Sequence, residues 1–257
     1  VQPMEGFDST PDGSPGPLSF RRYLRYARGG SGLLWFEATA ILHEARSNPH
    51  QFVLHEGSVA TFARLVAATR QAAREAFGHE IVAILQLTHS GRYSKPKGIP
   101  KPIIAHHSAV LDPKHPLPPD YPLVSDEYLD RLQETYVAAA KLAAQAGFDG
   151  VDVKACHRYL VSELLASHTR EGKYGGTLAN RSRFLREAVE KIAATVPNLF
   201  VTTRINVYDA IPYPYGFGVS RDDRAKPDLA EPIEVIRSLK QAGIPLVNVT
   251  AGNPYFN

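Results

Sequence analysis

The chain has 257 residues, of which 44% are hydrophobic, enough to build one α/β domain with a sizeable core. Its 29 basic and 26 acidic residues leave a net charge of +3 without a long run of either sign, so nothing indicates nucleic-acid binding. A single cysteine excludes an internal disulfide, and no apolar run approaches the roughly 20 residues of a membrane helix. We therefore expect a soluble, cytoplasmic protein without a metal site or a secretion leader.

Short apolar runs of strand length alternate with longer stretches whose apolar residues recur at helical spacing. In chain order this pattern predicts a strand at 32–38, a helix at 59–78, a strand at 81–87, a helix at 125–147, a strand at 150–153, a helix at 182–196, a strand at 199–205, a helix at 232–243 and a strand at 245–250. Ser125 is the expected N-cap of its helix and Gly147 the expected stop. Repeated strand and helix units predict a parallel sheet covered by helices.

Two architectures share this order of elements, an open doubly wound sheet and a closed (β/α)8 TIM barrel. No glycine-rich phosphate-binding motif follows any predicted strand. Polar residues instead stand at the carboxyl ends of the predicted strands, namely Glu37, Gln86 with His89, Lys154, Arg204 and Thr250. In a barrel these ends converge on one mouth, so we predict the barrel.

The ends of the chain indicate that the barrel is incomplete. Residues 1–4 are interpreted as the end of a first strand, which brings the count to six strands where a closed barrel needs eight. We expect a single domain over residues 1–257 that lacks the start of strand 1 and strands 7 and 8, as a piece of a longer polypeptide. The proline-rich segment 93–124 is interpreted as a long excursion after the third strand.

Several motifs, in chain order, resemble one family. They are VQPM (1–4), LLWFEAT (33–39), ILQLTHSGR (84–92), AGFDGVDVKACHRYL (146–160), KYGGTLANRSRFL (173–185) and VTTRI (201–205). The stretch YGGTLANRSRFL is the most specific of them. Together they resemble the old yellow enzyme family of flavin-dependent ene reductases, which is related to 2,4-dienoyl-CoA reductase and the NADH:flavin oxidoreductases.

The resemblance implies a cofactor, FMN, lying across the barrel mouth. It implies backbone contacts to the flavin from Pro3 and Met4, with Ala38 beside the reactive part of the ring. It also implies that Gln86 hydrogen-bonds the pyrimidine edge and that Arg204 stabilises negative charge on the reduced flavin. Glu5 departs from the family. It would either lower the flavin potential or pair with Lys154 or Arg92.

The resemblance also implies the residues that act on substrate. Family members carry two hydrogen-bond donors that polarise a substrate oxygen and a tyrosine that gives a proton to carbon. Lys154, His157 and Tyr159 match these positions, with Lys154 in place of the usual histidine. A lysine there would bind a carboxylate or another anionic group, or would contact the flavin.

Three functions follow from these residues. The first is an FMN-dependent oxidoreductase that takes hydride from NAD(P)H and passes it to an electron-poor alkene, with Tyr159 as proton donor. The second is a barrel lyase or aldolase that uses Lys154 as a Schiff-base nucleophile. The third is a flavin-binding barrel that has lost ene reduction. The expected partner is a small-molecule substrate, with a homo-oligomer left open, and neither nucleic acid nor a membrane is expected.

Overall fold

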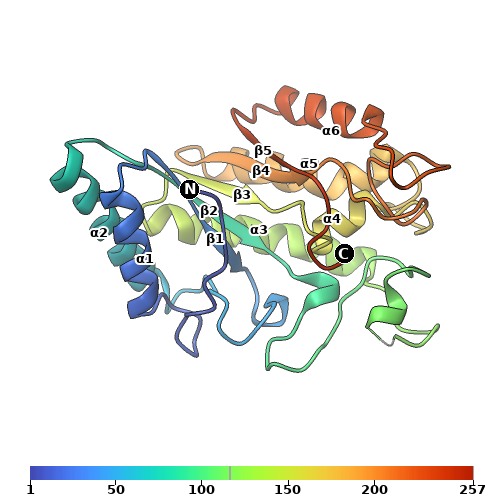
Figure 1. Ribbon diagram of the computed structural model, residues 1–257, viewed down its shortest axis with the longest axis horizontal. Helices are drawn as coiled ribbons and strands as arrows, with labels where there is room; N and C mark the ends of the chain where they lie inside the picture. Colours follow the sequence, from blue (N-terminus) through green and yellow to red (C-terminus); the bar gives the residue numbers. More distant parts are fainter. Residues whose placement is uncertain (116, 257) are drawn as a thin grey trace.

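The computed structural model describes residues 1–115 and 117–256, and over these residues the sheet has five strands, all parallel. The strands follow one another in chain order across the sheet (Figure 1). They are β1 (Leu33–Ala40), β2 (Val82–Thr88), β3 (Gly150–Val153), β4 (Phe200–Asn206) and β5 (Val247–Thr250). This sequential parallel order is that of a half-barrel and agrees with the predicted, incomplete (β/α)8 barrel.

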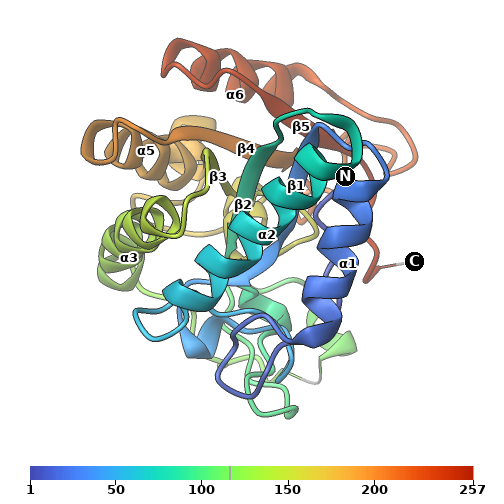
Figure 2. The same cartoon turned by 90° about the vertical axis from the view of Figure 1, so that its left-hand side faces the viewer.

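Helices cover the outside of the sheet. They are α1 (Pro17–Arg28), α2 (Val59–Phe77), α3 (Asp126–Gln145), the short α4 (Leu160–Leu165), α5 (Leu178–Thr195) and α6 (Ala230–Gln241). Figure 2 shows α2, α3, α5 and α6 following one another around the strands in chain order, as the crossovers of a barrel do. Within the described residues the loops contain the single-turn 3₁₀ helices η1 (His43–Ala45), η2 (Gly91–Tyr93) and η3 (Asp112–Lys114).

Local signals set most helix boundaries. The side chain of Ser125 accepts a hydrogen bond from the backbone N–H of Tyr128, as expected of an N-cap. The predicted start of α5 was wrong by four residues, because Thr177 caps the helix and places Asn180 and Arg181 inside it. Helix α1 was not predicted, although Pro17 stands at its first position.

The first predicted strand does not form a regular strand. Residues 1–4 run beside β1, where the amino group of Val1 donates to the carbonyl of Leu33 at 2.8 Å and the N–H of Trp35 donates to the carbonyl of Val1 at 3.1 Å. These two bonds are strand-like, but the segment leaves the sheet edge after them. The excursion at 93–124 contains η3 and a bridge between Ile104 and Leu123, and Pro116 within it lies outside the described residues.

The described part of the chain contains no helix long and apolar enough to cross a membrane. The interior of β1 to β4 is almost fully buried, whereas β5 at the sheet edge is half-exposed. The carboxyl ends of the strands and the loops that follow them lie at one end of the sheet (Figure 1). The polar residues predicted to gather there are therefore brought to one region.

Candidate functional site

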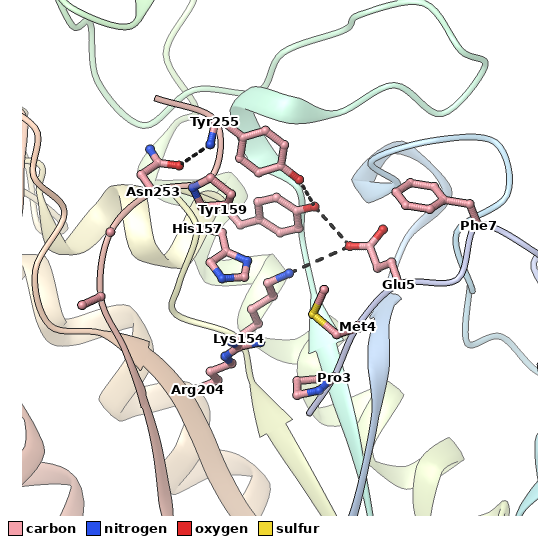
Figure 3. A pocket seen from close by; sticks show the side chains of 13 residues that line it. Pro3, Met4, Glu5, Phe7, Lys154, His157, Tyr159, Arg204, Asn253 and Tyr255 are labelled. Carbon is pink, nitrogen blue, oxygen red and sulfur yellow. Dashed lines mark hydrogen bonds and ion pairs between the residues drawn. The ribbon is translucent and has the colours of Figure 1, made fainter. Parts of the chain in front are cut away.

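A pocket of about 500 Å³ opens at the carboxyl ends of the strands. The resemblance assigned nine residues to the flavin or the substrate. Seven of them line this pocket, namely Pro3, Met4, Glu5, Lys154, His157, Tyr159 and Arg204. Figure 3 shows Lys154 and Tyr159 facing Glu5 across this pocket. The segment 1–5, the end of β3 and the middle of β4 thus meet, as the arrangement of a barrel mouth requires.

The loop after β3 presents two of these side chains through an unusual backbone turn. His157 and Arg158 have φ values of 61° and 58°, in the left-handed region that costs energy for residues other than glycine. The fully buried Arg158 anchors the turn, because its guanidinium pairs with Asp209 at 3.2 Å and donates to Nε2 of His106 at 3.1 Å. Arg158 therefore points away from the pocket and does not narrow it.

Tyr159 is hydrogen-bonded to Glu5, which lies 154 residues away in the sequence. The phenol donates to Oε1 of Glu5 at 3.1 Å, and Nζ of Lys154 lies 3.9 Å from the same oxygen and 3.8 Å from the centre of the Tyr159 ring. Burial, reinforced by the Glu5 charge, holds the pKa of Tyr159 well above its usual range. The phenol is therefore a protonated donor at neutral pH. Of the two partners expected for Glu5, the structure selects Lys154.

Glu37, a candidate strand-end residue, fixes the segment that carries Glu5. Its carboxylate accepts from the backbone N–H of Gly6 at 2.7 Å and pairs with Arg22. Burial raises the pKa of Glu37 to about 7. Glu37 therefore holds the N-terminal segment in place and does not line the pocket.

The other two candidates, Ala38 and Gln86, are fully buried and do not line the pocket. Nε2 of Gln86 donates to Asp152 at 2.6 Å, and the other oxygen of Asp152 accepts the backbone N–H of Arg204 at 2.7 Å. Trp35 also donates to Asp152, at 2.8 Å. Burial raises the pKa of Asp152 to about 6. Its three donors stabilise the buried carboxylate and connect β3 to β1, β2 and β4.

Several polar atoms near the pocket have no hydrogen-bond partner among the described residues. They are Oε1 of Gln86, Nε and Nη1 of Arg204, and Nδ2 of Asn253, all buried. Buried polar atoms are normally paired, so the unpaired donors of Arg204, which lines the pocket, point to a ligand that accepts hydrogen bonds there. His157 adds a neutral imidazole, because burial and the charges of Lys154 and Arg204 lower its pKa to about 3.

His89 and Arg92 anchor the loop after β2 and do not line the pocket. Nδ1 of His89 accepts the N–H of Gly91 at 3.0 Å, and its Nε2 lies 2.9 Å from the hydroxyl of Tyr128. Arg92 is fully buried and pairs with Glu163 at 2.5 Å and with Asp112 at 2.5 Å. These contacts make Arg92 an anchor of the loop after β2.

Burial of His89 has a measurable consequence for acid stability. Burial lowers its pKa from 6.5 to about 3, so the unfolded chain takes up its proton first. Its contribution to the free energy of unfolding is complete above about pH 6.5 and is lost progressively as the pH falls toward 3. We expect His89→Asn to flatten the slope of unfolding free energy against pH by about 1.4 kcal/mol per pH unit between about pH 6 and 4.

Urea titrations of the full-length protein at several pH values would measure this slope. Tyr128→Phe is the matched control, because it removes the same hydrogen bond and keeps the histidine. An unchanged slope in His89→Asn would contradict the assignment of a neutral buried imidazole.

Six lining residues, Phe7 and the segment 251–255, and one supporting residue were not predicted. Phe7, Asn253 and Tyr255 line the pocket, and the Tyr255 hydroxyl lies 3.2 Å from that of Tyr159. Tyr255 follows β5, so its place after the last strand was the available signal. Asp152 had a clearer signal, because a carboxylate inside the apolar run GVDV must find partners when the strand is buried.

The family model described as the NADH:flavin oxidoreductase / NADH oxidase family matches residues 1–216. Among curated proteins, the NADPH dehydrogenase of Bacillus pumilus (strain SAFR-032) is 29% identical over 246 residues, and that of Bacillus subtilis (strain 168) is 28% identical over 246 residues. Both alignments cover 94% of this chain and 64% of the relative, so the chain spans slightly less than two thirds of their length.

Solved structures share the fold. A 2-naphthoyl-CoA reductase in complex with 2-naphthoyl-CoA superposes with a TM-score of 0.79 at 22% identity, over 99% of this chain and 38% of that one. An old yellow enzyme homologue from Zymomonas mobilis gives 0.75 at 23% identity, over 97% and 68%. Morphinone reductase gives 0.73 at 24% identity, over 96% and 66%. These likenesses support the barrel fold.

Proposed function

The chain belongs to the NADH:flavin oxidoreductase / NADH oxidase family, and from this premise we propose that the full protein is an FMN-dependent oxidoreductase of the old yellow enzyme type. Hydride would pass from NAD(P)H through FMN, which supplies the redox chemistry, to an electron-poor alkene. Pro3, Met4, Glu5, Ala38, Gln86 and Arg204 are proposed to hold or adjoin the flavin. Lys154, His157 and Tyr159 are proposed to act on substrate.

The observation that carries this proposal is the set of unpaired atoms on Gln86 and Arg204. A flavin pyrimidine edge offers both acceptors and an N–H donor, and Oε1 of Gln86 with Nε and Nη1 of Arg204 are the complementary groups. Asp152 orients the amide of Gln86 and holds the backbone segment that carries Arg204. The residues present therefore fit the pyrimidine edge of FMN.

The substrate side of the pocket suits addition of hydride and a proton to a polarised alkene. Lys154 and neutral His157 offer N–H donors to a substrate oxygen that gains negative charge. Tyr159 keeps its proton at neutral pH, and rotation about its C–O bond turns that proton from Glu5 toward the pocket. We propose Tyr159 as the group that protonates the substrate carbon.

Reconstitution with FMN tests the cofactor. Full-length protein mixed with FMN and freed of excess cofactor should retain the visible flavin absorbance, and NADPH or NADH added without oxygen should bleach it. Arg204→Met is expected to retain less FMN, because it removes the donors that would face the flavin. Glu171→Gln alters an exposed residue and is the control. Wild-type protein that retains no flavin would reject the proposal.

The family assignment favours flavin chemistry over the Schiff-base alternative at Lys154. Borohydride trapping with a carbonyl substrate distinguishes the two, because only a Schiff base leaves a stable adduct on Lys154. A barrel that binds flavin but no longer reduces alkenes predicts bleaching by NAD(P)H, followed by reoxidation by oxygen and by no activated alkene.

A further inference from the structure

The ammonium group of Lys154 donates no hydrogen bond to any of the residues that the structure describes. The side chain is only 3% exposed and points into the pocket (Figure 3). Among residues 1–115 and 117–256, Nζ has two neighbours of note, Oε1 of Glu5 at 3.9 Å and the face of the Tyr159 ring at 3.8 Å. Neither accepts a hydrogen bond from it. An ammonium has three N–H donors, and this side chain borders the pocket, so a ligand bound there can accept hydrogen bonds from it.

Glu5 does not fill this role, because Oε1 lies 3.9 Å from Nζ, too far for a hydrogen bond, and both oxygens are held by other donors. Oε2 accepts from the hydroxyl of Ser47 at 2.8 Å and lies 3.4 Å from Nδ2 of Asn48. Oε1 accepts from Tyr159 at 3.1 Å. At 3.9 Å from Nζ, Glu5 lowers the cost of burying the charge without satisfying the donors of Lys154.

The other polar groups around Lys154 also favour an anion. The side chains lining the pocket include two basic groups, Lys154 and Arg204, and one carboxylate, Glu5. If Arg204 faces the flavin, Lys154 and the N–H of neutral His157 are the donors left for substrate. Those two donors match the two oxygens of a carboxylate, and a charge-assisted hydrogen bond is about twice as strong as a neutral one.

We propose that this site takes conjugated carboxylic acids, with the substrate carboxylate bound between Lys154 and His157. The inference rests on the proposed function and names its substrate class. Hydride, supplied by NAD(P)H through the flavin, forms the bond to the carbon β to the carboxylate. The electron pair of the alkene moves onto the carboxylate as an ene-diolate, whose added charge Lys154 stabilises. That pair then forms the bond from the α carbon to the Tyr159 proton, and the phenolate regains a proton from water.

Equilibrium binding to oxidised, FMN-loaded full-length protein tests the proposal without turnover. The probes are cinnamate and cinnamamide, which share a shape and differ in charge, and calorimetry or the shift of the flavin spectrum gives each affinity. We expect cinnamate to bind about tenfold or more tightly than cinnamamide at neutral pH. Lys154→Met should abolish the preference. Lys95→Met, which removes a positive charge from a neighbouring cavity, should keep it.

Glu5→Gln should change the preference in the opposite direction. Removing that carboxylate ends the repulsion of a bound acid and leaves Lys154 without a competing anion, so cinnamate should bind several-fold more tightly than to wild type. A loss of packing alone would weaken both probes in both variants. Equal affinity for acid and amide in wild type, or a preference that survives Lys154→Met, overturns the inference.

Turnover separates this inference from the proposed function. If reduced enzyme is reoxidised by a neutral enone while cinnamate is neither bound in preference nor reduced, the inference fails and the proposed function stands. If no activated alkene, acid or neutral, reoxidises the flavin of wild-type protein, the proposed function fails, and the inference, which names a substrate for it, fails with it.

Discussion

Tyr159→Phe is expected to slow reoxidation of the reduced flavin by an activated alkene by about 10²-fold to 10⁴-fold, the usual contribution of a positioned general acid. The phenol is the buried proton donor of the pocket whose pKa lies well above its usual range, and phenylalanine keeps the ring that packs against Lys154 and Tyr93. Stopped-flow absorbance of the full-length, FMN-loaded enzyme measures each half-reaction separately.

Reduction of the flavin by NAD(P)H is the internal control for this variant. Because Tyr159 gives its proton to the alkene only, the reductive rate should stay within about twofold of wild type. Tyr255→Phe removes the hydroxyl that lies 3.2 Å from Tyr159 and should slow reoxidation far less. If Tyr159→Phe slows both half-reactions alike, the residue is structural and another group donates the proton.

Glu163→Ala is expected to lower the free energy of unfolding by about 3–5 kcal/mol, because it leaves the buried guanidinium of Arg92 without its buried counter-ion. Arg92 and Glu163 are both fully buried, and the guanidinium donates to Oε1 of Glu163 through Nε at 2.9 Å and through Nη2 at 2.5 Å. Asp112 also pairs with Arg92 but is partly exposed and can neutralise the charge only in part. Urea denaturation of the full-length protein followed by circular dichroism measures the loss.

Two variants make this stability test specific. Glu171→Ala removes an exposed carboxylate eight positions along the chain and should cost less than about 0.5 kcal/mol. The double variant Arg92→Met with Glu163→Ala should be less destabilised than the sum of its single changes, because no uncompensated charge remains. Strict additivity would show that the ion pair contributes nothing beyond packing.

The start of α5 was predicted too late and α1 was not predicted, and both errors have one physical cause. Prediction from apolar spacing starts a helix where the apolar stripe begins, yet caps and first turns are polar. Thr177 and Asn180 at the start of α5 therefore read as loop. In α1 the buried side chains are Ser19, Tyr23 and Ala27, which recur every four residues but are too polar or too small to form a clear apolar stripe.

The candidate site was only partly predictable for a similar reason. The motif after β3 marked Lys154, His157 and Tyr159 by sequence, and the structure brings all three to one pocket with Arg204. The partner of Glu5 stayed open between Lys154 and Arg92, and the buried pair of Arg158 with Asp209 had no sequence signal. Each of these pairs joins residues from different strands or loops. The sequence around one residue therefore does not indicate which residue it will contact.

The sequence by itself determined the order of strands and helices, the parallel sheet and the family, because periodicity and motif spacing are local properties of the chain. The tertiary structure decided which charged groups meet. Glu5 and Tyr159 are 154 residues apart and share a hydrogen bond because segment 1–5 runs beside β1 and brings Glu5 to the pocket. Such contacts depend on how distant segments pack together, and the free energy of a buried charge depends on the partners that packing supplies.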